Sequence, residues 1–314
     1  MGNTQERGRI MKKSKKLIAL LLSLVFVTVL FTACKNSTKA TDGASATDKT
    51  TTAPTSDKSA KRAGTARTLD EIKKSGKVII GVFSDKKPFG YVDENGAYQG
   101  YDVYFGNRIA KDLGVDVEYV PVDPASRVEF LTSAKVDIIL ANFTLTEERA
   151  EKVDFALPYM KVSLGIVSPD KALITEPKQL KGKKLIIAKG TTAETYFSEN
   201  YPDVKLIKFD QYSDAYSALL DGRGDAFTTD NTEVLAWALE NKGYSVGVES
   251  LGSVDSIAPA VQKGNKELLD WINDEIKTLG NEQFFHKDYE ETLAPVYGAA
   301  ASADNLVVEG GVIK

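Results

Sequence analysis

Three short segments of the chain carry the polar and charged side chains that could hold a small charged molecule. The first begins at Asn142, contains Thr144 and ends at Arg149, directly after an apolar stretch. A threonine inside it can cap a helix, so free N–H groups, the Thr144 hydroxyl and the Arg149 guanidinium could together bind a carboxylate. Alternatively, Arg149 is a solvated helix residue that pairs with Glu148 or Glu151.

The second segment is Gly190-Thr191-Thr192, which again follows an apolar stretch. Thr191 and Glu194 fit the capping box S/T-x-x-E, a motif that is structural on its own. Its position nevertheless predicts a second helix N-terminus, which could face the first segment across a ligand.

The third segment ends an apolar stretch at Asp230. Its carboxylate could accept hydrogen bonds from a ligand ammonium group, or it could cap a helix that begins near Thr232. A free amino acid carries both a carboxylate and an ammonium group, and burying it requires opposite charges and satisfied hydrogen bonds. The three segments together could supply these.

The elements that must position these residues alternate between short apolar runs and amphipathic runs. Alternation of this kind predicts open α/β sheets with helices on both faces. We expect strands at Val78–Phe83, Val117–Val122, Val136–Ala141, Leu164–Ser168, Leu185–Ala188, Lys205–Phe209, Asp225–Thr229 and Ile257–Val261. We expect helices at Tyr101–Leu113, Ser126–Ser133, Glu147–Lys152, Ala193–Asn200, Ser213–Leu220, Thr232–Asn241 and Lys266–Leu279.

The series occurs twice, which predicts two lobes. The first lobe comprises residues 68–160 plus 260–298, the second comprises residues 161–259, and residues 299–314 form a C-terminal tail. Two crossings, near 160–164 and 255–260, connect the lobes. Ligands of open α/β sheets bind beyond the carboxyl ends of the strands, so two facing lobes would enclose a ligand between them.

The N-terminal region predicts export. Lysines 12, 13, 15 and 16 precede an apolar run over 17–31, which is typical of a secretory signal peptide covering residues 1–33. A membrane-spanning helix is the alternative, but the run is shorter than the ~20 residues such a helix needs. Cys34 follows directly, in a sequence that resembles a lipoprotein box. Residues 34–67 hold few apolar side chains after the cysteine and predict a disordered tether. An acylated tether suits the outer face of the membrane of a Gram-positive-type bacterium.

Composition excludes several classes of function. The chain has 314 residues, with one cysteine and one histidine, which rules out a disulfide framework, a thiolate metal site and Ser-His-Asp hydrolysis. We therefore expect no metal, no cofactor and no enzymatic activity. The chain has 40 basic and 44 acidic residues, of which six basic and one acidic lie in the first 34 residues. The rest of the chain therefore has 34 basic and 43 acidic residues, a net charge of −9. Such a surface argues against nucleic-acid binding.

Several ordered motifs resemble family 3 of the bacterial extracellular solute-binding proteins, the polar amino-acid receptors of ABC importers. The match covers roughly residues 68–297 and rests on Pro88-Phe89-Gly90-Tyr91, Gly100-Tyr101-Asp102, the segment from Asn142 to Asp154, Gly190-Thr191-Thr192 and Gly222-Arg223-Gly224-Asp225-Ala226. The resemblance implies a type II periplasmic-binding-protein fold, with two α/β lobes that are joined by a two-strand hinge and close on the ligand. It also implies delivery to a membrane permease and its ATPase.

The resemblance assigns roles to individual residues. It implies that Arg149 holds the ligand α-carboxylate and Asp230 the ammonium group, and that Asn142, Thr144 and Thr192 add polar contacts. Phe89 and Thr191 lie in the same motifs, so we include them among the ligand-binding residues. Arg127 aligns with an arginine that contacts the ligand side chain in acidic-amino-acid receptors. Here it could pair with aspartate or glutamate, or brace the α-carboxylate of a smaller ligand.

Within this family the chain is most similar to the cysteine-binding receptors, through four segments. These are Ala141-Asn142-Phe143-Thr144, Pro158-Tyr159-Met160-Lys161-Val162, Asp230-Asn231-Thr232 and Phe284-Phe285-His286-Lys287. We therefore predict a monomeric lipoprotein that binds cysteine first, with aspartate and glutamate next. The competing hypotheses are a surface adhesin or antigen on the same fold and an enzyme related to it, such as a dehydratase.

Overall fold

The computed structural model describes residues 64–313. The predicted signal peptide, the lipidation at Cys34 and most of the predicted tether lie outside the described residues, as does Lys314. The description below therefore begins at the short α1 (Leu69–Ser75), which Thr68 caps through a reciprocal pair of hydrogen bonds with Glu71.

The first of two large sheets has five strands in the order β5-β1-β6-β13-β7. The strands are β5 (Asp116–Pro121), β1 (Lys77–Val82), β6 (Ile138–Ile139), β13 (Ala260–Gln262) and β7 (Val153–Phe155). β1 is parallel to β5 and β6, whereas β13 is antiparallel to β6 and β7. Residues 260–262 thus return to the sheet that the N-terminal residues begin. We call this sheet and its helices the first lobe.

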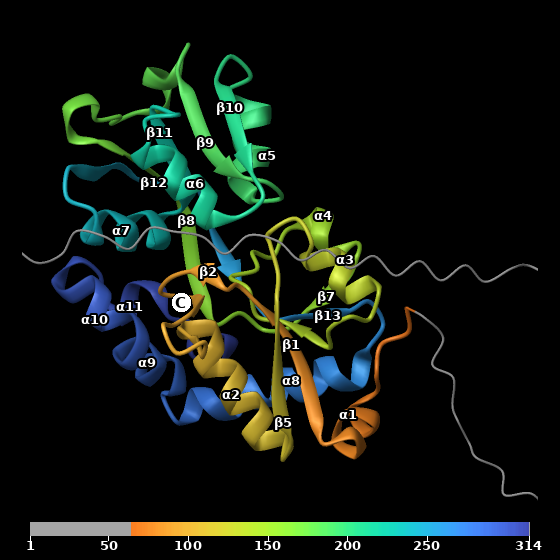
Figure 1. Cartoon of the computed structure of the whole chain (residues 1–314). Coiled ribbons are helices and arrows are strands. Elements are labelled where there is room, and N and C mark those ends of the chain that lie inside the picture. Colours follow the sequence, from red (N-terminus) through yellow and green to blue (C-terminus); the bar gives the residue numbers. More distant parts are fainter. Residues whose placement is uncertain (1–63, 314) are drawn as a thin grey trace, which may run out of the picture. The chain divides into compact units, whose positions relative to one another are not determined.

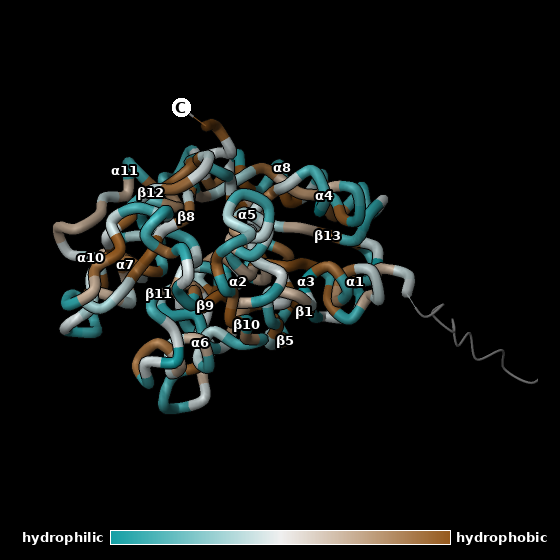
Figure 2. Tube along the Cα trace, turned by 90° about the horizontal axis from the view of Figure 1, so that it is seen from above, coloured by the Kyte–Doolittle hydropathy of each residue, from teal (hydrophilic) through white to brown (hydrophobic). Residues whose placement is uncertain are grey.

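After α1, the helices of the first lobe are α2 (Tyr101–Leu113), α3 (Arg127–Thr132), α4 (Glu147–Ala150) and α8 (Lys266–Asn281). Both α2 and α8 bury an apolar side, whereas α4 has no buried residue. In α8 the buried residues are Leu268, Ile272, Ile276 and Leu279, spaced by three or four positions as one helix face requires. The alternation of apolar and polar residues along α8 can be followed in Figure 2.

The second sheet also has five strands, in the order β10-β9-β11-β8-β12, and with its helices it forms the second lobe (Figure 1). The strands are β10 (Lys205–Phe209), β9 (Lys184–Ala188), β11 (Ala226–Asp230), β8 (Met160–Pro169) and β12 (Tyr244–Ile257). The helices are α5 (Thr192–Asn200), α6 (Tyr212–Leu220) and α7 (Asn231–Glu240), with short 3₁₀ turns at Asp170–Ala172 and Pro177–Leu180.

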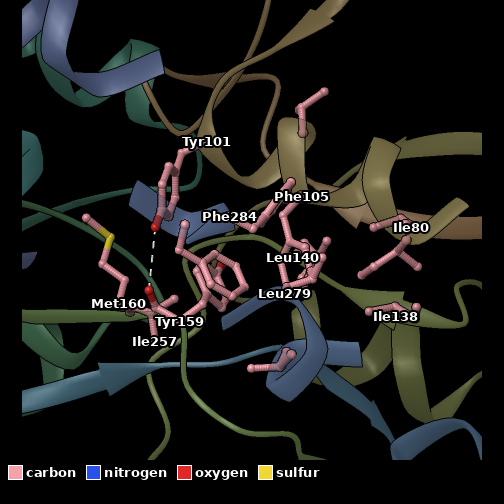
Figure 3. Packing of buried hydrophobic residues seen from close by; sticks show 14 of the residues in the cluster. Ile80, Tyr101, Phe105, Ile138, Leu140, Tyr159, Met160, Ile257, Leu279 and Phe284 are labelled. Carbon is pink, nitrogen blue, oxygen red and sulfur yellow. Dashed lines mark hydrogen bonds between the residues drawn. The ribbon is translucent and has the colours of Figure 1, made fainter. Parts of the chain in front are cut away.

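Two long antiparallel strands, β8 and β12, connect the two sheets. Their register runs from Tyr244 opposite Pro169, in the second lobe, to Ile257 opposite Met160, next to the first. Met160 and Ile257 belong to the apolar cluster that also holds Ile80 and Ile138 of the first sheet (Figure 3). The connecting strands are therefore anchored in the core of the first lobe.

A small three-stranded sheet lies between β1 and α2 in the chain. It consists of β2 (Asp85–Lys86), β3 (Gly90–Val92) and β4 (Tyr98–Gln99). The backbone N–H groups of Tyr101 and Asp102 donate to the carbonyls of Pro88 and Phe89. These bonds fix the loop after β2 against the first turn of α2.

The C-terminal region packs onto the first lobe and the start of β8. It contains α9 (Phe284–Asp288), a π-helical turn at Tyr289–Leu293, α10 (Ala294–Tyr297), α11 (Ala303–Leu306) and 3₁₀ turns at Gly298–Ala300 and Glu309–Gly311. Val307 pairs with Met160, and Val308 N–H donates to the carbonyl of Tyr159. Part of the segment predicted as a tail thus completes the apolar cluster of Figure 3.

The predicted alternation of strands and helices is confirmed, with local differences. The strands β2, β3, β4, β7 and β12 were not predicted, and neither were α1, α10 and α11. The strand expected over 136–141 is reduced to Ile138–Ile139, although the neighbouring N–H groups of Asp137 and Leu140 still donate to carbonyls of β1. The strand expected over 257–261 is divided between the last residue of β12 and β13.

Candidate functional site

Arg149 lies where the first lobe meets the second. Thr146 caps α4, and its hydroxyl accepts the N–H of Arg149. The guanidinium Nη1 donates to the carbonyl of Thr144 at 2.8 Å, and Nη2 donates to the carbonyl of Gly190 in the second lobe at 2.9 Å. Glu148 pairs with Lys152 instead. The guanidinium therefore points across the boundary between the lobes, and burial lowers its pKa.

Arg127 lies beside it and is only 3% exposed. Its guanidinium donates to the carbonyls of Pro124, Ala141 and Asn142 at 2.9–3.2 Å, and to Gly190 at 3.3 Å. Burial, and then the charge of Arg149, lower the pKa of Arg127 to about 9. Both guanidiniums also lie over the ring of Phe143, at 4.4 and 4.9 Å from its centroid.

These two arginines form a positive site without a paired anion. Among the described residues, all of their side-chain hydrogen bonds go to backbone carbonyls and none goes to a carboxylate. A buried charge is normally compensated by a paired charge as well as by hydrogen bonds. The arrangement therefore suits an incoming carboxylate, which could take bidentate hydrogen bonds from a guanidinium.

Asn142 has a buried side-chain amide without hydrogen-bond partners among the described residues. It is 2% exposed, and its φ is 44°. Its N–H donates to the Asp102 carboxylate at 2.8 Å, and the Tyr159 hydroxyl donates to the same carboxylate at 2.5 Å. Thr144, two residues on, is also buried. The structure thus holds Asn142 in an uncommon conformation with its amide unused.

In the second lobe, the turn after β9 presents Gly190 to the arginines. Thr191 caps α5, accepts the N–H of Glu194 and donates its own hydroxyl to Ala188 O at 2.7 Å. The Glu194 carboxylate accepts the N–H of Gly190, one residue before the position that the capping box predicts. The Thr191 hydroxyl is therefore used inside its own turn, whereas Thr192 begins α5 and is partly exposed.

Asp230 is buried at the end of β11 and does not cap the helix that follows. Its side chain makes no capping hydrogen bond to α7, and the Asn231 side chain accepts the N–H of Thr232 instead. The Asp230 carboxylate contacts the ammonium group of Lys86, in the first lobe, at 3.1 Å. Of the two roles considered from the sequence, only the charge-pairing one agrees with this geometry.

Lys86 is a residue of the site that the sequence analysis missed. Its ammonium group contacts both Asp230 and Glu233, the latter at 2.7 Å, and it lies within 6 Å of three aromatic ring centroids. The rings belong to Phe83, Phe89 and Tyr212. Phe89, predicted to bind ligand, is completely buried and is one of these rings. The adjacent Pro88-Phe89-Gly90-Tyr91 motif was the available signal.

The charged residues of the site thus form two groups, both at the boundary between the lobes. The predicted Arg127 and Arg149 meet Gly190, and the predicted Asp230 meets Lys86, which was not predicted. The Asp230 charge opposes the effect of burial on the pKa of both arginines, so the two groups act on each other electrostatically. A groove of about 830 Å³ opens beside Arg149, Gly190 and Thr192, with residues of both lobes along its walls.

The described residues 64–313 contain no group of three or more His, Cys, Asp or Glu side chains placed to hold a metal ion. Within the same residues, no helix has both the length and the apolar character needed to cross a membrane.

The fold and the site define a two-lobed binding protein with its candidate site between two α/β lobes. Residues 78–292 match the family of bacterial extracellular solute-binding proteins, family 3. The chain belongs to this family, as the sequence motifs predicted. Membership confirms the prediction of a transport protein, the substrate-binding component of an amino-acid ABC transporter, in place of an enzyme.

Individual relatives agree with this assignment. The solute receptor for L-cysteine of Neisseria gonorrhoeae is 51% identical and covers 77% of this chain and 100% of its own, with a TM-score of 0.76. The cysteine-binding protein from Campylobacter jejuni is 53% identical over 77% of this chain and 98% of its own, also with a TM-score of 0.76. The glutamine-binding protein GlnH of Bacillus subtilis is 29% identical over 89% of this chain and 97% of its own length. The type II periplasmic-binding-protein fold is thereby confirmed.

Proposed function

We propose that this chain binds L-cysteine between its two lobes and delivers it to the permease of an ABC importer. The single observation that carries the site is the pair of guanidiniums of the buried Arg127 and the partly buried Arg149, which have only carbonyl partners and lie in electrostatic reach of the Asp230 carboxylate in the opposite lobe. One small zwitterion could neutralise both groups.

In the proposed complex the ligand carboxylate binds Arg149, and Arg127 braces it. The side-chain amide of Asn142 and the Thr144 hydroxyl donate hydrogen bonds to the same carboxylate. The N-terminus of α5, at Thr192, supplies backbone N–H donors from the second lobe. Charge-assisted hydrogen bonds contribute about 1.5–3 kcal/mol each. Four of them, less the cost of ordering the lobes, would give micromolar or tighter binding, about −8 kcal/mol.

At the other end, the ligand ammonium group binds Asp230. This carboxylate is buried at the carboxyl end of β11, where ligands of open α/β sheets are found. The rings of Phe83, Phe89 and Tyr212, all buried, surround the Lys86 ammonium group that contacts this carboxylate. They place apolar surface beside the proposed ammonium site.

Cysteine is proposed first among the polar amino acids because the two similar receptors described above, at 51% and 53% identity, are named for cysteine. Relatives named for glutamine and arginine are 25–36% identical. Aspartate and glutamate come next, since a second guanidinium at Arg127 could take a side-chain carboxylate.

A thermal-shift screen of the purified protein against the twenty amino acids tests the ligand. We expect the largest increase in melting temperature with cysteine, kept reduced, followed by aspartate and glutamate. Stabilisation by basic or aromatic amino acids alone would refute this order.

Arg149→Ala tests the site. We expect it to abolish the cysteine-induced shift while leaving the melting temperature of the unliganded protein nearly unchanged, because Arg149 donates only to two carbonyls. Lys152→Ala is the matched control, since Lys152 is an exposed cation close by that pairs with Glu148. A large loss of stability without ligand would show that Arg149 is structural.

We further propose that residues 1–33 are a signal peptide and that Cys34 is acylated, holding a monomeric receptor on the outer face of the cell membrane. The support is the sequence alone: a basic segment, an apolar run and the chain's only cysteine follow one another in order. Metabolic labelling with a fatty acid tests this: the wild type should incorporate the label and Cys34→Ala should not. Equal labelling of the two proteins, or none in the wild type, would contradict lipidation at Cys34.

A further inference from the structure

Lys86 lies in a setting that is unusual for a lysine. It is 1% exposed, although long cationic side chains are almost never fully buried unless paired. Its two partners, Asp230 and Glu233, come from β11 and α7 of the second lobe, whereas Lys86 itself is in β2 of the first. The contacts of this one ammonium group therefore cross the boundary between the lobes.

Lys86 is charged in this position. Burial alone would lower its pKa, but the negative charges around it, Glu233 first, outweigh burial and raise it. Glu233 is itself fully buried, and burial raises its pKa to about 7 against the effect of Lys86. The hydroxyl of Tyr216 also donates to Glu233. A positive charge thus stands permanently beside Asp230, the residue proposed to hold the ligand ammonium group.

One hydrogen of the Lys86 ammonium group is left for a ligand. An ammonium group has three N–H donors. Among the described residues, the carboxylates of Asp230 and Glu233 are the only polar partners of Lys86. The rings of Phe83, Phe89 and Tyr212 surround it and offer the ammonium group their π faces.

Fold stability does not explain why a lysine is present. A buried ion pair is on balance weakly stabilising, because desolvation offsets the attraction, and an apolar residue of similar size often serves as well. The neighbouring Lys87 shows the ordinary alternative: it reaches Glu240 in α7 through an exposed ion pair at 2.7 Å. Placement of Lys86 at the inner wall of the site therefore points to recognition.

We propose that Lys86 selects the ligand by the charge of its side chain: it donates a hydrogen bond to a short side chain that accepts one or carries negative charge, and it repels a cationic side chain. This inference rests on the proposed function, because it places the ligand between Arg149 and Asp230. Cysteine, with a sulfur that can bear negative charge, satisfies the requirement. Diaminobutyrate, a short amino acid with an ammonium group in its side chain, violates it.

Binding titrations of wild type and Lys86→Met with cysteine, alanine and diaminobutyrate test the proposal. Alanine has the same ligand main chain without the sulfur, so the ratio of its Kd to that of cysteine isolates side-chain recognition from closure of the lobes. We expect this ratio to fall at least tenfold in Lys86→Met, and the affinity for diaminobutyrate relative to alanine to rise at least tenfold.

Two further variants keep the test decisive. Lys86→Met leaves two buried carboxylates without their cation, and this variant could fail to fold for that reason. The double variant Lys86→Met/Glu233→Gln removes one of the two negative charges and then replaces it in the test. It should show the same change in both Kd ratios. Lys87→Met is the control, since it removes a cross-lobe lysine that is exposed, and both ratios should stay at their wild-type values.

The outcomes separate this proposal from the proposed function. If the affinities for all three ligands fall together and both ratios stay constant, Lys86 only holds the lobes together and the selection proposal is wrong. If the wild type binds another amino acid and not cysteine, the proposed ligand is wrong. The ratios are then measured with that amino acid, its analogue without a polar side chain and diaminobutyrate, and constant ratios again overturn the proposal.

Discussion

At the scale of single residues, a buried carboxylate positions Asn142, one of the residues proposed to bind the ligand. Asp102 is fully buried and accepts hydrogen bonds from Asn142 N–H and from the Tyr159 hydroxyl, directly before β8. Burial raises the pKa of Asp102 from 3.8 to about 7, although both hydrogen bonds act in the other direction. The residue thus joins the binding segment to the start of the hinge and also titrates near neutral pH.

Asp102→Asn tests this titration. Between about pH 4 and 7 the folded protein retains a proton on Asp102 that the unfolded chain has released, so this group's contribution to stability falls as the pH rises. From pH 5 to 7.5, the free energy of unfolding of wild type should decrease relative to that of the variant by about 1–3 kcal/mol. Urea unfolding of both proteins at three pH values measures this difference. Burial also raises the pKa of Glu233 to about 7, but Glu233 is present in both proteins and its contribution cancels. Parallel curves would show that Asp102 does not titrate in this range.

The residues proposed to bind the ligand could be predicted only where a local sequence motif indicated them. Arg149 follows a capping threonine, and Asp230 ends an apolar strand, so their positions are visible in the sequence. Lys86 is 144 positions from Asp230, and in sequence it is one of two lysines in a polar run. Lysines in such runs are usually solvated, and the adjacent Pro88-Phe89-Gly90-Tyr91 motif does not tell which of Lys86 and Lys87 is the buried one.

At the scale of elements, the turn between β9 and α5 brings the lobes together. Gly190 has a φ of +73°, and a Cβ atom built on it would lie 2.6 Å from Cα of Ala125 in the first lobe. The glycine therefore serves two purposes, since it allows the left-handed turn and lets two backbones approach closely. Its carbonyl, at the same place, accepts from Arg149 and Arg127.

Gly190→Ala should weaken ligand binding, because the added methyl group meets the backbone of the first lobe only when the lobes are closed. Gly182→Ala is the matched control: its φ is +75° in the same lobe, and a Cβ atom there meets nothing within 4 Å. Both variants should lose about 1 kcal/mol of stability from backbone strain, and only Gly190→Ala should lose affinity, by tenfold or more. Equal affinities in calorimetric titration would mean that this close approach is absent from the liganded state.

Most helices and strands could be predicted from the spacing of apolar residues. The exceptions include strands that are held extended by pairing with another strand. Lys205–Phe209 and Tyr101–Leu113 were predicted to the residue. β12 escaped prediction because its 14 residues are mostly exposed or half-buried and its register against β8 shifts three times. Each shift breaks the alternation of apolar and polar residues by which a strand is recognised in sequence. Only the partner strand β8, which is buried along most of its length, keeps β12 extended.

At the scale of the whole described chain, the sequence predicted two lobes and the residues near which they are connected, since the β-α series repeats. The contacts that close the lobes could not be predicted in the same way. Arg149 with Gly190, Lys86 with Glu233 and Asp85 with the N–H of Ser213 each join residues that are distant in the chain. The exact boundaries of the lobes at residues 160 and 260 stay a prediction.

Ligand binding should shift the protein from an open to a closed arrangement of the lobes. In the closed arrangement the buried Arg127 and the partly buried Arg149 have carbonyl partners alone, and the lowered pKa of each reflects the cost of removing its charge from water. A ligand carboxylate offsets it only when the lobes close, and this differential affinity is what drives a conformational equilibrium. Small-angle X-ray scattering should therefore show a smaller radius of gyration at saturating cysteine than without it. Arg149→Ala should show no decrease in the radius of gyration at the same cysteine concentration. If calorimetry shows that the wild type binds cysteine but its scattering curve does not change, the free protein is already closed.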